Sequence, residues 1–109
     1  MQAGRELDAK VAGALKGWEP EFIEHLKEND GWILIPHYST DWRRMGELVE
    51  EAKEKEIYLD YSHSLNGGYY GFAGIFADGE YQIHHNTPTV DKAPYAICLA
   101  FLMAKGIEV

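Results

Sequence analysis

The sequence predicts an α+β domain, in which a three- to four-stranded antiparallel sheet is covered by helices as an α/β/α sandwich. Three segments repeat apolar residues at helical spacing, the period changes to two over residues 57–85, and turn motifs divide that alternating stretch into three strands. The predicted order is helix, helix, strand, strand, strand, helix (α-α-β-β-β-α) within one domain of residues 1–109. A content of 46% hydrophobic and 26% charged residues is typical of a globular chain.

The first helix is predicted over residues 3–16, and Gly17 is suited to end it. Its apolar residues recur at helical spacing: Leu7, Val11, Ala14, Leu15 and Trp18. Residues 19–31 fit either a short helical turn, which would include Phe22, Ile23 and Leu26, or an elaborated loop. The apolar run 32–35 ends at Pro36 and predicts a short edge strand.

The second helix is predicted to begin after Ser39 or Thr40, because either side chain can cap a helix. Its apolar stripe comprises Trp42, Met45, Leu48, Val49 and Ala52. The opposite side of this 39–55 helix carries many carboxylates, which are typical of a solvated helix face.

Three strands are predicted over residues 57–65, 69–76 and 80–85, joined by turns at Asn66-Gly67 and Asp78-Gly79. If both loops have two residues, one face collects the large aromatic side chains and becomes the core face. The other face is then small in its middle, with Asp60, Ala73 and His84 in one row. Such a row would admit a close helix or form a shallow groove. A three-residue first loop would swap the faces of the first strand and remove the row.

The last helix is predicted over residues 93–105, with Asp91 as its cap, Pro94 in its first turn and Gly106 at its end. Its interior is apolar nearly all round, so it needs cover on more than one side. The sheet plus another helix would provide that cover, as would the sheet plus a second copy. We expect a homodimer through this helix, with Leu99 and Met103 as interface candidates. The alternative is that the segment 19–26 folds over it.

Composition excludes several classes of partner. The chain has 18 acidic and 10 basic residues and a net charge of -8, which disfavours binding to nucleic acid or to an anionic membrane. The apolar run at 93–104 is too short to span a bilayer, and the first residues contain no apolar leader. Cys98 is the only cysteine, so no intrachain disulfide forms. We expect a cytoplasmic protein.

For each set of candidate catalytic residues, a purely structural role explains the residues better than catalysis does. His84 and His85 are neighbours on a strand and should point to opposite faces, so we expect no metal site and no cofactor. Cys98 lies inside an apolar helix, where a cysteine is ordinarily an unreactive core residue. Asp60, Ser62 and His84 supply an acid, a hydroxyl and a base, but strand geometry separates Asp60 from His84 by about 9–10 Å.

The segment Pro36–Asp41 opens a helix, whose free amides can hold an anion. Tyr38, Ser39, Thr40 and Asp41 are therefore binding candidates. A helix cap with an aromatic side chain packed on the core explains the same residues, and we favour it.

Three segments in order resemble the phage ABA sandwich domain, a family of small phage and prophage proteins. They are Ala3–Ala12, Ile35–Asp41 and Ala93–Ala100. The resemblance implies a sheet with helices on both faces and a place in the cytoplasm of a host cell. It provides no catalytic residues to carry over.

We predict a non-enzymatic accessory protein that binds another protein or itself. One alternative is a small hydrolase or ligand-binding protein that uses the face of Asp60, Ser62 and His84. Another is an acidic inhibitor that mimics DNA, for which the helix 39–55 supplies carboxylates only locally.

Overall fold

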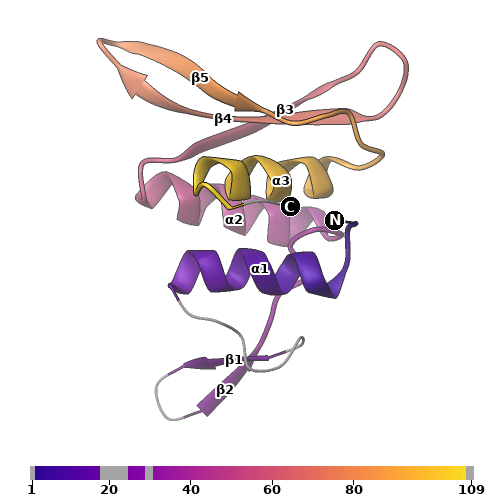
Figure 1. Cartoon of the computed structure of the whole chain (residues 1–109), viewed down its shortest axis with the longest axis vertical. Coiled ribbons are helices and arrows are strands. Elements are labelled where there is room, and N and C mark those ends of the chain that lie inside the picture. Colours follow the sequence, from indigo (N-terminus) through magenta and orange to yellow (C-terminus); the bar gives the residue numbers. More distant parts are fainter. Residues whose placement is uncertain (1, 18–24, 29–30, 108–109) are drawn as a thin grey trace.

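The computed structural model describes residues 2–17, 25–28 and 31–107. Its elements are, in chain order, α1 (Arg5–Lys16), β1 (His25–Glu28), β2 (Gly31–Leu34), α2 (Trp42–Glu54), β3 (Tyr58–His63), β4 (Tyr69–Ala77), β5 (Glu80–Asn86) and α3 (Ala93–Ala104) (Figure 1). The α+β class is confirmed, and so is the order of two helices, three strands and a final helix. The hairpin β1–β2 is an addition between the first two helices.

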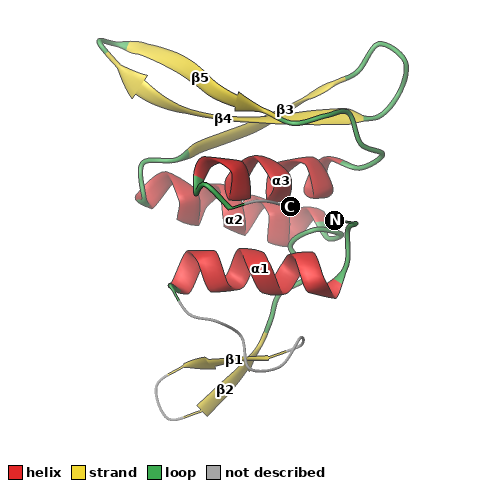
Figure 2. Cartoon of the chain, in the orientation of Figure 1, coloured by secondary structure: helices red, strands yellow, loops and turns green. Residues whose placement is uncertain are grey.

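β1 and β2 pair antiparallel and form a separate two-stranded sheet, at the opposite end of the molecule from the three-stranded sheet (Figure 2). The strand predicted at 32–35 is therefore present as β2, but it does not join the main sheet as a fourth strand. Leu26 lies in β1, not in a helical turn or loop. The rest of the segment 19–30, and with it the question whether that segment covers the last helix, lies mainly outside the described residues.

All three helices lie on one side of the main sheet (Figure 1). α3 packs directly on the sheet, and both α1 and α2 pack on α3. Covering α3 thus occupies both other helices, because its apolar surface runs nearly all round its axis. The helical layer on the second face that the resemblance implied is not formed by the described residues.

α3 is the centre of the core. Its fully buried apolar residues are Ala93, Ala96, Ile97, Cys98, Ala100, Phe101 and Leu102. The cover predicted as "sheet plus another helix" is thus present within one chain. Gly106, with a φ of 72°, follows the helix as predicted. Its N-cap, however, is Lys92 and not Asp91, and no side chain caps it.

The first hairpin of the main sheet has a three-residue loop. The Ser64 amide donates to the carbonyl of Gly68 (3.0 Å), and strand pairing begins at His63 and Tyr69. The Gly67 amide donates to the carbonyl of Ser64 (3.2 Å), so Leu65 and Asn66 are the central residues of the turn, and Gly67 (φ 90°) and Gly68 (φ 84°) follow it in left-handed conformations. The two-residue loop expected here is wrong, and the faces of β3 are swapped accordingly.

The second hairpin has the predicted two-residue turn, with positive φ at both Asp78 (53°) and Gly79 (80°). Its register then shifts between Ala73 and Gly74, because Gly74 pairs with Ile83 whereas Ala73 pairs with His85. His84 is the extra residue of this β-bulge. The predicted row of Asp60, Ala73 and His84 is therefore absent, since Ala73 lies between Leu59 and His85.

The small residues of the sheet face α3. This is one of the two arrangements predicted for them, in which a helix packs close to the sheet. Ala73 is fully buried, and Gly71 lies so close to the helix that a Cβ there would be 2.5 Å from the carbonyl oxygen of Ala96. The close approach brings β4 and α3 into direct backbone contact at Gly71.

Candidate functional site

The face of the main sheet that points away from the helices is aromatic. Strand pairing places ten residues on it: Tyr58, Asp60, Ser62, Tyr70, Phe72, Gly74, Phe76, Tyr81, Ile83 and Asn86. We call this surface the open face. None of the helices in the described part of the chain lies over it (Figure 1). The register found for the first hairpin creates it, because that register moves Leu59 and Tyr61 to the helix side and leaves Tyr58 among the aromatic residues of β4 and β5.

The aromatic rings of the open face form a continuous cluster. Tyr81 is its centre, with ring centroids 6.5 Å from Tyr58, 6.4 Å from Phe72 and 6.4 Å from Phe76. Tyr70 extends the cluster, 6.2 Å from Phe72. These separations lie in the range in which aromatic pairs attract one another. The cluster is therefore an ordered apolar surface, made by side chains that hold one another in place.

Two side chains of this cluster are strongly exposed. Phe76 is 61% and Ile83 is 51% accessible, although both belong to the residue types that proteins most often bury. They lie on neighbouring strands, so they form one patch and not two scattered residues. Contiguous apolar patches of this kind mark contact surfaces in soluble proteins.

Two polar side chains of the open face have hydrogen-bond partners within the chain. The Tyr81 hydroxyl donates to the carbonyl of Tyr58 (2.8 Å), and partial burial, with the nearby Asp60 carboxylate as a second cause, raises the pKa of Tyr81. Asp60 accepts from the amide of Tyr61 (2.8 Å). Asp60 is also the one charged residue among the ten that make up this face.

The predicted triplet of Asp60, Ser62 and His84 does not come together. Asp60 and Ser62 lie on the open face, whereas His84 lines a pocket of about 170 Å³ on the helix side, beside Ile57 and Ala104. That pocket includes neither Asp60 nor Ser62. The hydroxyl and the acid are thus separated from the imidazole by the sheet itself.

His84 and His85 were expected on opposite faces, because an uninterrupted strand alternates between its faces, and the β-bulge removes that premise. The bulge places both beside one pocket, since an extra residue interrupts the alternation of a strand. Two imidazoles alone do not complete a metal site. Among the described residues, no group of three or more His, Cys, Asp or Glu side chains is arranged to hold a metal ion.

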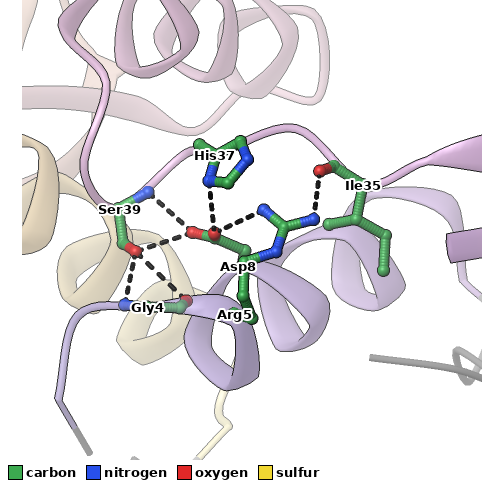
Figure 3. A network of polar contacts seen from close by, with 6 residues as sticks. All are labelled: Gly4, Arg5, Asp8, Ile35, His37 and Ser39. Carbon is green, nitrogen blue, oxygen red and sulfur yellow. Dashed lines mark hydrogen bonds and ion pairs between the residues drawn. The ribbon is translucent and has the colours of Figure 1, made fainter. Parts of the chain in front are cut away.

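A buried polar network joins two of the segments that carry the family resemblance (Figure 3). Asp8 of α1 is fully buried and accepts from both the amide (2.8 Å) and the hydroxyl (2.6 Å) of Ser39. Arg5 donates to the other Asp8 oxygen (2.9 Å) and to the carbonyl of Ile35 (2.6 Å). The Gly4 amide donates to the Ser39 hydroxyl (2.9 Å). The network fastens the start of α1 to the chain before α2.

This network contains a serine, a histidine and an aspartate, but not in a catalytic arrangement. In a catalytic triad the histidine lies between the other two and takes the proton of the serine. Here Ser39 donates directly to Asp8, and the His37 Nδ1 lies 3.9 Å from the far oxygen of Asp8. Ser39 is also fully buried. The hydroxyl therefore has no base and no access to a substrate.

The other candidates before α2 have structural partners as well. Tyr38 is buried, and its pKa is raised by burial and by the nearby Glu51 and Glu47. Asp41, and not Ser39 or Thr40, caps α2 by accepting from the amides of Arg43 (2.8 Å) and Arg44 (3.4 Å). Its carboxylate occupies the amides that an anion would need. Thr40 is exposed.

The interface candidates of the last helix lie in different environments. Leu99 is 6% accessible within one chain, whereas Met103 is partly exposed. The need for a second copy to cover α3, which motivated both candidates, is thus met by α1, α2 and the sheet. Cys98 is buried, and desolvation raises the pKa of its thiol well above the usual value, so the reactive thiolate is suppressed.

Two features of this surface and network were missed by reasoning from sequence. Tyr70, Phe72, Phe76, Tyr81 and Ile83 were assigned to the core face, because the register placed them there. Asp8 was not singled out, although a carboxylate between Leu7 and Val11 on an apolar helix stripe is a sign of a buried, paired group.

Comparison with known proteins identifies the fold. No protein-family model matches the chain, and no protein with a curated description matches it. Among solved structures, a phage protein from Bacillus cereus ATCC 14579 superposes with a TM-score of 0.72, covering 100% of this chain and 92% of that chain at 22% sequence identity. None of the helices in the described part of this chain has the length and hydrophobicity needed to cross a membrane. At this identity the likeness establishes a shared fold.

Proposed function

We propose that this chain is a phage or prophage accessory protein that works without catalysis, by binding a protein surface through the open face of its sheet. The observation that carries the proposal is the exposure of Phe76 (61%) and Ile83 (51%) within one ordered aromatic cluster. Aromatic residues dominate the energy of protein interfaces, because they bury much area at little entropic cost. The phage protein of the same fold and the resemblance in the helix segments support the phage origin.

The alternatives have weaker support in the geometry. A hydrolase needs an acid, a base and a nucleophile that converge, and Asp60, Ser62 and His84 lie on two sides of the sheet. A DNA mimic needs free carboxylates in a row, but Glu47 of α2 is paired with Arg44 (2.8 Å). The protein-binding role is the one that uses the most unusual surface of the molecule.

Site-specific photo-crosslinking tests the proposal. A photoreactive phenylalanine analogue is placed at residue 76, on the open face, and in a matched variant at Glu50, an exposed position of α2 on the helix side. In cells that naturally carry the gene, we expect a discrete protein adduct from position 76 and none from position 50. Equal adduct patterns from the two positions, or none from position 76, would contradict the proposal.

A further inference from the structure

We infer that the protein bound by the open face is a second copy of this chain, so that two sheets pack face to face around a two-fold axis; this inference rests on the proposed function. We infer the identity of this partner from the charge, the area and the shape of the open face. Each argument uses residues of the open face that the structure describes.

Charge selects a partner for this face that does not rely on ion pairs. The chain has a net charge of -8, yet Asp60 is the one charged residue among the ten of the open face. A basic partner would be attracted to the acidic helix α2, and this face offers it a single carboxylate. Two copies of the chain repel one another least when they meet through their least charged surface. In that arrangement the helices, including α2 with its four glutamates, lie on the two outer sides (Figure 1).

The area is that of a small but specific dimer. Five partly exposed aromatic rings and Ile83 present on the order of 500 Å² per copy, judged from the size of aromatic side chains. Two copies would bury about 1,000 Å² in total, which is the lower limit for a specific interface. An interface at this limit is typical of a transient dimer and not of an obligate one.

The geometry of the face suits self-complementary packing. β4 is the middle strand, so Phe72 lies near the centre of the face, between Asp60 and Asn86, whereas Phe76 lies beside Tyr81 towards the turn of the second hairpin. Two flat antiparallel sheets pack at about 10 Å with their side chains interdigitated. Because the Tyr81 hydroxyl is already bonded to the carbonyl of Tyr58, its burial leaves no donor unpaired.

Analytical ultracentrifugation of the full chain tests the inference, from low micromolar to near-millimolar concentration. We expect the weight-average mass to rise from 12.4 kDa towards twice that value. The double variant Phe76→Thr, Ile83→Thr should weaken association by about tenfold or more, as expected for loss of the two most exposed apolar side chains of the open face. The matched control is Ile75→Thr, a neighbouring and similarly exposed (44%) residue on the other side of β4, which should leave the association unchanged.

A salt series on the unaltered chain provides a second test that needs no variant. Salt screens the repulsion between two acidic chains, so association through the open face should strengthen at high ionic strength. Weakening with salt would overturn the inference, because it indicates an interface made of ion pairs. A mass that stays at 12.4 kDa overturns the inference but not the proposed function, if position 76 still crosslinks to a different protein. Equal weakening by Ile75→Thr and by the double variant would also overturn it.

Discussion

At the scale of single residues, the most important polar group on the helix side of the molecule is the buried carboxylate of Asp8. A buried charge is tolerated only when it is paired and hydrogen-bonded, and Asp8 has a cation in Arg5 and two donors in Ser39. Every buried side-chain nitrogen and oxygen among the described residues has a hydrogen-bond partner. The network thus determines how α1 meets the segment before α2.

Replacement of Asp8 by alanine should lower the free energy of unfolding by about 3 kcal/mol, because the Ser39 amide and hydroxyl lose their acceptor in a buried site. The loss is below that of a fully buried ion pair, since the Arg5 side chain is 22% exposed. Asp8→Asn keeps the shape and one acceptor, and should lose less. Urea unfolding measures both, with Asp91→Ala at an exposed position as the control. Equal stability of all three variants would show that the network contributes nothing.

At the scale of elements, the contact of β4 with α3 depends on the absence of a side chain at Gly71. We expect Gly71→Ala to destabilise the fold by about 1–3 kcal/mol, the usual cost of overpacking, since its Cβ would meet the backbone of Ala96. Gly46→Ala in α2 is the matched control. No atom lies within 4 Å of its added Cβ, and alanine is favoured over glycine in a helix by about 1 kcal/mol, so this variant should be more stable. Thermal melts compare the two, and a destabilised Gly46→Ala would contradict the explanation.

The elements were predictable from sequence, but the sheet faces were not. Helical periodicity and the turn at Asp78-Gly79 are local properties, and they place α1, α2, α3 and the second hairpin correctly. In the first hairpin, however, Asn66-Gly67-Gly68 is compatible with a loop of two residues or of three. The one extra loop residue that is present moves every side chain of β3 to the opposite face.

The site was unpredictable for the same reason. The bulge at His84 depends on tertiary contacts of Gly74, where a Cβ would clash with the carbonyl of Gln82, and no local pattern announces it. Once β3 is shifted and β5 bulged, the aromatic residues expected in the core lie on the surface. The buried location of Cys98 in an apolar helix, by contrast, needed no register and was expected correctly.

At the scale of the whole molecule, the fold is one-sided. The sheet has the layer of α2 and α3 on one face, with α1 beyond it and the β1–β2 hairpin beyond α1 (Figure 1). Because α3 is apolar nearly all round, both α1 and α2 pack on it. No helix among the described residues lies on the aromatic side of the sheet. The exposed face is thus a direct consequence of the composition of α3, and self-association is the simplest way to cover it.

The most direct test of the contact surface is a concentration series of amide NMR spectra from the isotopically labelled chain. We predict that the amide signals of Phe72, Phe76 and Ile83 shift together as the protein is concentrated, whereas those of Glu50 and Lys53, on the exposed side of α2, stay constant. Spectra that do not change with concentration, or shifts confined to the helices, would contradict the account that the open face is where this protein binds another copy of itself.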